Sequence, residues 1–217
     1  MIKVDLHTHS FASLDGGIKP QQYKTILESG QLDCVAITDH NRIDAAQELR
    51  KSLGNKVIVG EEIMTTDGEL IGLFLTKAIE PHQSALVTAK AIKAQGGLVY
   101  VPHPFETVRS GLPQTCLDEL VYLIDIVEVH NGRAIFQNLG PKAATWARLN
   151  RKVVAASSDA HGYAGLATTY TELASIPTAK TLVKLLETAR FSTNRPPLRS
   201  LLYPKLNRMS KHLGKKS

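Results

Sequence analysis

The sequence predicts an α/β fold built around a mostly parallel sheet. Short apolar runs rich in Val, Ile and Leu alternate with helix-like stretches along most of its 217 residues. The runs lack strict polar alternation, as expected of strands that are buried on both faces. The length suits a single domain with a sizeable core. Alternation of strands and helices is typical of parallel sheets whose strands are connected by helices.

Seven apolar runs are the predicted strands, namely Ile2–Leu6, Cys34–Thr38, Val57–Val59, Leu70–Thr76, Leu98–Val101, Ile124–Val129 and Val153–Ala156. Six stretches between or after these runs are the predicted helices, namely Pro20–Ser29, Asp44–Leu53, Gln83–Gln95, Thr115–Leu123, Asn138–Asn150 and Ala179–Ala189. The interval between the third and fourth runs is too short for a helix. We therefore expect those two strands to pair as a hairpin-like unit.

Basic charge is concentrated at the C-terminal end of the chain. The formal net charge is +6, and the eight basic residues after position 187, where no acidic residue occurs, are Arg190, Arg195, Arg199, Lys205, Arg208, Lys211, Lys215 and Lys216. Removing these eight charges leaves −2 for residues 1–187. We expect a domain of residues 1–195 and a basic tail of residues 196–217 that is dispensable for catalysis on small substrates. The alternative is a tail that recruits nucleic acid or docks across the mouth of the site.

Cysteine usage and hydropathy favour a cytoplasmic protein. Cys34 and Cys116 lie far apart in the sequence and suggest no disulfide framework. No apolar run is long enough to span a bilayer, and the first residues lack the apolar stretch of a signal peptide. We therefore expect no membrane partner, and the sequence leaves the oligomeric state open.

Most candidate ligands for a metal fall at or just past the carboxyl end of a predicted strand. In strand order they are His7 and His9, Asp39 and His40, Glu61 and Glu62, His103, and Asp159 and His161. Active sites of parallel barrels and open α/β sheets are built at that edge. We therefore expect these side chains to converge.

Two pairs of these residues share one spacing, His7-x-His9 and Asp159-x-His161. Residues i and i+2 of an extended chain point to the same side, so each pair offers two donors to one cavity. Imidazole mixed with carboxylate suits zinc, manganese or iron(II). Glu62 could bridge two ions, and two ions ~3.5–4 Å apart can hold and deprotonate a water while neutralising a phosphate.

Each motif taken alone could have a purely structural role. Asp39-His40 could cap the following helix, for example, and His130 is open between a pocket-lining role and a neutral one. Because all the motifs are predicted to lie at one edge of the sheet, we favour a role in metal binding. The sequence contains no Gly-x-Ser-x-Gly motif, P-loop or dinucleotide-binding glycine fingerprint.

Five segments resemble, in family order, the motifs of the PHP (polymerase and histidinol phosphatase) superfamily. They are Asp5-Leu6-His7-Thr8-His9-Ser10 with Asp15-Gly16, Ala36-Ile37-Thr38-Asp39-His40-Asn41, Gly60-Glu61-Glu62-Ile63, Pro102-His103-Pro104 and Ser158-Asp159-Ala160-His161. The resemblance runs from residue 2 to about 170. It implies a distorted (β/α)7 barrel with up to three metal ions at the carboxyl ends of its strands. It also implies hydrolysis of phosphate esters without a covalent enzyme intermediate.

The resemblance assigns ligands residue by residue. It implies three sets, with one ion held by His7, His9, Glu62 and Asp159, a second by Asp15, His40 and His161, and a third by Glu62 and His103. Within these sets His7, His9, Glu62 and His161 are the expected catalytic residues. Many members have a further histidine in the segment where this chain has Glu69. Either Glu69 replaces that histidine as an oxygen ligand, or the third site is weak.

Two arginines are candidates for binding the substrate phosphate. Arg109, in the loop after His103, is placed to clamp a phosphate with a bidentate guanidinium, and Arg133 is the second candidate.

The leading functional hypothesis is a metal-dependent phosphatase with two or three ions of Zn, Mn or Fe. Its substrate would be a small phosphorylated molecule such as a nucleotide, a nucleotide bisphosphate, or a sugar or amino-alcohol phosphate. One alternative is a nuclease acting on oligonucleotide ends, which the negative charge of residues 1–187 disfavours. Another is a non-catalytic metal-binding module, which the near-complete ligand set disfavours.

Overall fold

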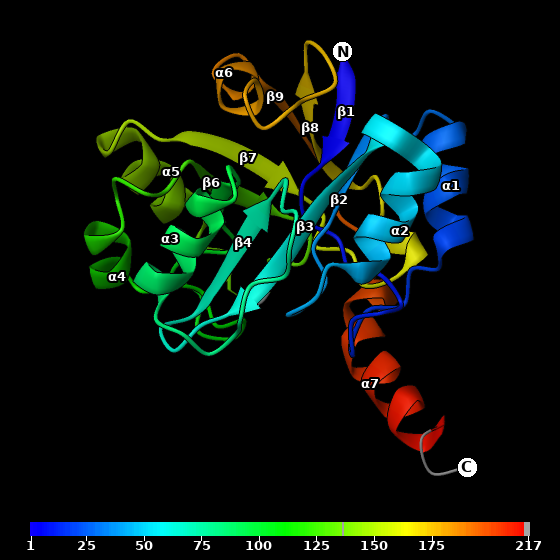
Figure 1. The fold of residues 1–217 in the computed structure, drawn as a ribbon. Helices are drawn as coiled ribbons and strands as arrows, with labels where there is room; N and C mark the ends of the chain where they lie inside the picture. The colour runs from blue at the N-terminus through cyan, green and yellow to red at the C-terminus, as the bar shows by residue number, and fades with distance from the viewer. Residues whose placement is uncertain (136, 215–217) are drawn as a thin grey trace.

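The computed structural model describes residues 1–135 and 137–214 (Figure 1). The strands are β1 (Ile2–Asp5), β2 (Cys34–Ile37), β3 (Val57–Met64), β4 (Glu69–Leu73), β5 (Leu98–Val101), β6 (Ile126–Asn131), β7 (Val153–Ser157), β8 (Thr169–Leu173) and β9 (Arg190–Thr193). The α-helices are α1 (Pro20–Glu28), α2 (Asp44–Leu53), α3 (Ala85–Ala94), α4 (Gln114–Glu119), α5 (Gly140–Leu149), α6 (Leu182–Leu186) and α7 (Tyr203–Gly214). Lys215 and Lys216 of the predicted tail lie outside the described residues.

The strands within the described residues form one sheet in the order β7-β6-β5-β4-β3-β2-β1-β8-β9. Each of the seven predicted strands corresponds to one of β1 to β7. The predicted hairpin-like unit is confirmed, because β3 and β4 pair antiparallel from Gly60↔Leu73 to Met64↔Glu69. The expectation of a mostly parallel sheet is corrected. Four neighbouring pairs of the described strands are parallel, and the four pairs that involve β4 or β8 are antiparallel.

The curved sheet nearly closes into a barrel where the chain continues past β1 and β7. There His9 N donates to Ala160 O at 2.9 Å, and Asp159 N donates to His7 O at 2.9 Å. Figure 1 shows α1 and α2 to the right of the sheet and α3, α4 and α5 to the left. Strands β1 to β7 form the wall, and β8 and β9 are added beside β1. The predicted distorted (β/α)7 barrel is confirmed.

Buried apolar side chains form one cluster inside the barrel and two outside it. The inner cluster draws residues from each of β1 to β8 and from α6, for example Leu6, Ile58 and Tyr100. One outer cluster packs the sheet against α1 and α2, and the other packs it against α3, α4 and α5. Both faces of the wall strands are therefore covered, which explains why they are continuous apolar runs in the sequence.

Two strands, β8 and β9, are missing from the sequence prediction. The side chains of Thr169–Leu173 alternate between buried and half-buried, and Arg190–Thr193 is largely exposed, so neither segment is an apolar run. The β-branched and aromatic residues of Thr169-Tyr170-Thr171 in the first segment are the weak signal that favours a strand there. The last predicted helix is shorter than expected, since α6 covers only Leu182–Leu186.

No helix of the described residues is both long and apolar enough to cross a membrane. Cys34 is buried, Cys116 is half-buried, and both thiols are free.

A buried hydroxyl links β8 to β7, and its removal is expected to destabilise the fold. Thr171 Oγ1 accepts from Ala156 N at 3.0 Å and donates to Ala156 O at 2.9 Å, with Thr171 fully buried. Thr171→Val keeps the shape but leaves both backbone groups of Ala156 without this partner. We expect a loss of about 2–4 kcal/mol in the free energy of unfolding, measured by urea denaturation.

The matched control is Thr193→Val, which makes the same change on the exposed strand β9. It is expected to change the stability by less than about 0.5 kcal/mol. Equal stabilities of the two variants would mean that Thr171 does not link the strands.

Candidate metal centre

The first histidine pair enters the barrel because the chain stays extended past β1. Thr8 points outward, where its hydroxyl donates to Ala36 O at 2.7 Å and lies 3.0 Å from the Tyr23 hydroxyl. Alternation then turns His7 and His9 to the inside, where both imidazoles are fully buried. Their Nε2 atoms lie 3.1 Å apart. The structure therefore brings this pair together as its spacing predicts.

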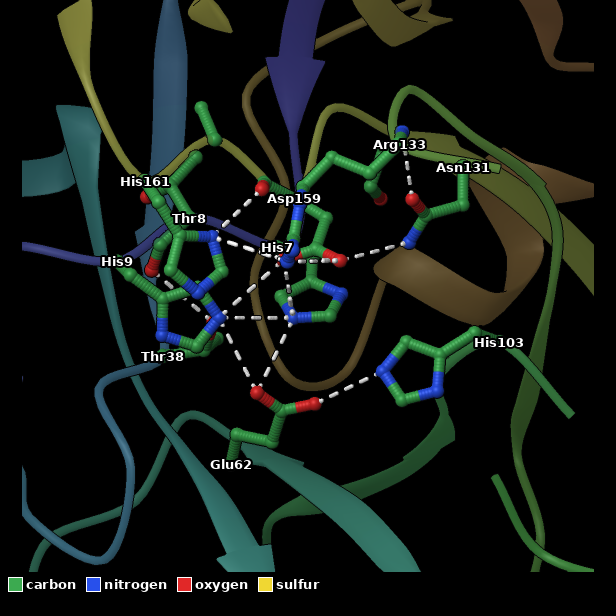
Figure 2. Close-up of polar contacts among 12 residues, drawn as sticks. His7, Thr8, His9, Thr38, Glu62, His103, Asn131, Arg133, Asp159 and His161 are labelled. Carbon is green, nitrogen blue, oxygen red and sulfur yellow. Dashed lines mark hydrogen bonds and ion pairs between the residues drawn. The ribbon is translucent and has the colours of Figure 1, made fainter. Parts of the chain in front are cut away.

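Glu62 faces both the first histidine pair and His103, and dashed lines join its carboxylate to all three imidazoles in Figure 2. Its Oε2 is 3.1 Å from His9 Nε2 and 3.4 Å from His7 Nε2, and its Oε1 is 3.2 Å from His103 Nε2. The neighbouring Glu61 points elsewhere, and its Oε2 accepts from Ile79 N at 2.8 Å. One carboxylate with its two oxygens directed at different histidines is suited to bridging two cations.

The second spaced pair reaches the same cavity from the end of β7. Asp159 Oδ1 lies 3.5 Å from His9 Nε2, 3.6 Å from His7 Nε2 and 3.3 Å from His161 Nδ1. Asp159 has a φ of +52°, in the left-handed region that a non-glycine residue seldom adopts. The backbone hydrogen bond from Asp159 N to His7 O stabilises this turn at the barrel closure.

Asp15 comes from the loop between β1 and α1. Its Oδ2 lies 3.5 Å from both His40 Nε2 and His161 Nε2. Its Oδ1 accepts from the Ser13 hydroxyl at 2.9 Å. The loop therefore delivers the carboxylate to two imidazoles that come from the ends of β2 and β7.

Glu69, at the start of β4, occupies the side of the cavity near the third expected ion. Its Oε1 is 3.7 Å from His40 Nδ1, and its Oε2 is 3.8 Å from His103 Nε2. Burial and the negative charges of Glu62 and Asp159 raise the pKa of Glu69 to about 9. The raised pKa reflects an excess of negative charge, which a bound cation would relieve.

The donor set fits divalent metal ions. The ligand atoms fall into groups whose members all lie within 4.8 Å of one another, namely His9, Asp15, His40 and His161; His7, Glu62 and His103; His7, His9 and Asp159; and His40, Glu62 and Glu69. His40 Nδ1 is buried without a hydrogen-bond partner among the described residues and lies 3.4 Å from Glu62 Oε2. Imidazoles and carboxylates packed this closely are typical ligands of divalent transition metals.

Glu128 is the most important residue that the sequence analysis missed. Its Oε1 accepts from the Tyr100 hydroxyl at 2.8 Å and lies 3.2 Å from His7 Nδ1. Its Oε2 accepts from His103 N and from Asn131 Nδ2, each at 2.8 Å. Because Nδ1 can donate its hydrogen to the Glu128 carboxylate, Nε2 of His7 keeps a lone pair that faces the cluster and can bind a metal ion. The position of Glu128 at the end of a predicted strand was the available signal.

Two other residues at the strand ends lie outside the cluster. Asp39 accepts from Ser10 N at 2.7 Å and from the Ser10 hydroxyl at 2.5 Å, so it anchors the start of the Asp15 loop. His130 is exposed and lies beside Phe191, with ring centroids 5.9 Å apart, which favours the neutral role for it. An irregularity between Glu128 and His130 in β6 shifts the register there.

A pocket of about 550 Å³ opens over the cluster, and its lining includes Arg109, Arg133 and Arg208. The Arg109 guanidinium already donates to Glu106 at 2.6–2.9 Å and to Asp159 Oδ2 at 2.8 Å. Arg133 NH1 makes only longer contacts, of 3.3–3.4 Å, to Asp159 and His161. Arg133 Nε is buried without a partner among the described residues. The guanidinium of Arg109 is therefore more fully engaged by carboxylates than that of Arg133, and the roles of both arginines in phosphate binding stay predictions.

The C-terminal segment predicted as a basic tail contacts the loop that carries Asp15. Helix α7 follows Pro197 and places Asn207, Arg208 and Lys211 against the loop that carries Asp15. The boundary at residues 195 and 196 stays a prediction.

Comparison with known proteins places the chain in a family. It is 33% identical over 151 residues to the uncharacterized protein MJ1587 of Methanocaldococcus jannaschii, covering 64% of this chain and 88% of that protein. It is 35% identical over 170 residues to the uncharacterized protein MJ0417 of the same organism, covering 74% of this chain and 65% of that protein, which is less than two thirds of its length.

A solved structure shares the fold. It is a two-domain protein from Bacteroides vulgatus that contains a predicted PHP-like metal-dependent phosphoesterase, and it matches with a TM-score of 0.72 and 18% identity. The match covers 95% of this chain and 69% of that one. The PHP domain family model matches residues 5–181, which include every member of the metal cluster. The chain therefore belongs to the PHP domain family.

Proposed function

We propose that this protein is a metal-dependent phosphoesterase that hydrolyses a phosphate ester of a small molecule. The observation that carries the proposal is the convergence of buried imidazoles and carboxylates beneath an arginine-lined pocket. The phosphoesterase described for the Bacteroides vulgatus relative supports the reaction class. A volume of about 550 Å³ is in the range of pockets for small-molecule ligands, which supports a small phosphorylated substrate.

Two or three ions of zinc, manganese or iron would occupy the cluster. The proposed sets are His7, His9, Glu62 and Asp159 for the first ion, Asp15, His40 and His161 for the second, and Glu62, Glu69 and His103 for the third. The second set lies within one group of ligand atoms that are all within 4.8 Å of one another, and this group also contains His9. The first and third sets each combine members of two different groups. When bound, the ions would act as Lewis acids on the phosphate and lower the pKa of an attacking water.

The chain's own residues would position the reactants. His7, His9, Glu62 and His161 would act catalytically as ligands, with Glu128 orienting His7. Arg133 lines the pocket, has a donor without a partner among the described residues, and would bind the substrate phosphate. Arg109 would act with it mainly by fixing Asp159, because Glu106 occupies its bidentate face.

Metal is expected to be integral to both activity and stability. Chelation should abolish hydrolysis across a panel of small phosphomonoesters, and Mn²⁺ or Zn²⁺ added back separately should restore it. Because the ions bind only the folded state, stability should rise by about 2.7 kcal/mol when free metal is at one hundred times its Kd. The measurements are turnover and thermal unfolding on the same samples. Full turnover by metal-free protein would contradict the proposal.

Glu62 is expected to be the most sensitive position. Glu62→Gln removes one negative charge and one ligand oxygen from the centre of the cluster, so at least two ions should be lost. Activity should fall by more than about 100-fold, since even residues behind metal ligands cost about 10- to 100-fold. Elemental analysis of metal per chain and turnover measure the two effects.

The matched control for this prediction is Glu61→Gln, one residue away. Glu61 is buried, and a glutamine oxygen can still accept from Ile79 N. Metal content and activity should stay close to wild type. If Glu61→Gln lost metal and activity while Glu62→Gln kept both, our assignment of which residue faces the metal centre would be reversed.

Arg133 is expected to contribute to substrate binding. Arg133→Lys keeps the positive charge near Asp159 but removes the fork that pairs two donors with a phosphate. KM should rise by about tenfold, which corresponds to about 1.4 kcal/mol of binding. Steady-state kinetics measure this, with the exposed Arg148→Lys as control. A larger rise of KM for Arg109→Lys than for Arg133→Lys would restore Arg109 as the main phosphate ligand.

A further inference from the structure

The loop that carries Asp15 is held from outside the barrel by one lysine of α7. Lys211 Nζ donates to Phe11 O and Gly16 O, each at 2.7 Å, and also to Ser13 O. An ammonium group has three donors, and all three are used here. Lys211 therefore gathers three carbonyls of this loop, residues 10–17, around one cation.

One asparagine of the same helix joins two ligand-bearing segments. Asn207 Nδ2 donates to Asp15 O at 2.7 Å and to His161 O at 3.0 Å. Asp15 and His161 are far apart in the sequence, yet their side chains meet at 3.5 Å. The amide of Asn207 therefore sets the spacing between the backbones that present the two side chains.

Two glycines allow α7 to approach this closely. A Cβ at Gly17 would lie 2.8 Å from Asn207 Nδ2, and a Cβ at Gly162 would lie 2.3 Å from the Tyr203 ring. A side chain at either position would displace the Asn207 or the Tyr203 side chain that α7 packs there. The α7 contact is therefore built into the loop and into the segment after β7.

Contacts outside α7 also hold this loop. Arg42 NH1 donates to Ala12 O at 3.0 Å, His40 N donates to the Ser13 hydroxyl at 3.4 Å, and Asp15 Oδ2 faces His40 and His161 at 3.5 Å. Ser10, at the base, is hydrogen bonded to Asp39, and Phe11 N donates to Ile18 O. Toward Asp15, the Ser13 hydroxyl belongs to the same loop. The contacts of Asp15 with α7 comprise the bond from Asn207 and a 3.1 Å ion pair with Arg208. Among the described residues, the hydrogen bonds that the Asp15 and Gly16 carbonyls accept from outside the loop come from α7.

We propose that α7 is an integral part of the metal centre, with Lys211 and Asn207 acting as positioning residues for the Asp15 loop. By holding this loop they keep Asp15 where it can share one ion with His40 and His161. The family match ends at residue 181, so α7 lies beyond the shared domain. The inference rests on the metal centre of the proposed function and replaces the expectation of a dispensable tail.

The test compares Lys211→Met with Lys205→Met in the full-length protein. Lys205 is exposed on the same helix and has no hydrogen bond or ion pair with any described residue, so the control removes an equal charge. Metal content per chain and Kd for Mn²⁺ or Zn²⁺ are measured by elemental analysis and titration. Lys211→Met should lose one ion per chain or weaken its binding by about tenfold or more. Lys205→Met should match wild type, and Lys211→Arg should recover part of the loss.

A second measurement separates positioning from a purely structural role. The melting temperature of each variant is recorded in chelator and again with saturating metal. Positioning predicts a smaller metal-induced rise for Lys211→Met, with a melting temperature in chelator close to wild type. A lower melting temperature in chelator with an unchanged metal-induced rise would overturn the inference. Asn207→Ala, measured in the same way, provides an independent variant if Lys211→Met does not fold.

Failure of this inference can be distinguished from failure of the proposed function. Wild-type protein that binds no divalent metal would overturn the proposed function and this inference together. Wild-type protein that binds metal, with Lys211→Met and Asn207→Ala binding it equally well, would overturn the role of α7 alone.

Discussion

Two backbone hydrogen bonds join the chain just past β1 to the chain just past β7, from His9 N to Ala160 O and from Asp159 N to His7 O. They close the barrel at its carboxyl rim, and they lie within the residues that carry the first and last ligand pairs. Without this closure the two pairs would stand at opposite ends of a curved wall. The cluster around Glu62 therefore depends on the closure more than on any single side-chain contact.

The closed rim concentrates negative charge where little water reaches. Burial opposes ionisation, yet nearby histidines and Arg133 keep the pKa of Glu62 and Asp159 well below the ordinary values. Glu69 has no such surplus of positive neighbours, and its pKa rises to about 9. Divalent cations bound at this rim would neutralise the negative charge of its buried carboxylates. Under our proposals, Glu128 and the α7 contacts would position the imidazoles and Asp15 around those cations.

The sequence by itself determined the wall of the barrel and the residues at its rim. Strands β1 to β7 are covered on both faces, so their apolar runs mark them without knowledge of the fold. Candidate ligands such as His7 and Glu62 lie at or just past the ends of those runs. Period-2 alternation also predicts that Glu61 points away from Glu62, as the structure has it. Spacing along the sequence was sufficient to predict these side-chain directions, because successive side chains of an extended strand point to opposite faces.

Only the tertiary structure decided what surrounds that rim. Strands β8 and β9 are partly exposed and have no apolar run to mark them. An irregularity in β6 separates Glu128, which is buried at the site, from His130, which is exposed. Lys211 and Asn207 bind backbone carbonyls, which every residue possesses, so no pattern of residue types could identify their partners. The pattern of residue types along a strand or helix indicates which side chains are buried and which way they point. The contact between Asn207 and Asp15 joins segments nearly 200 residues apart, and only the folded chain brings these segments together.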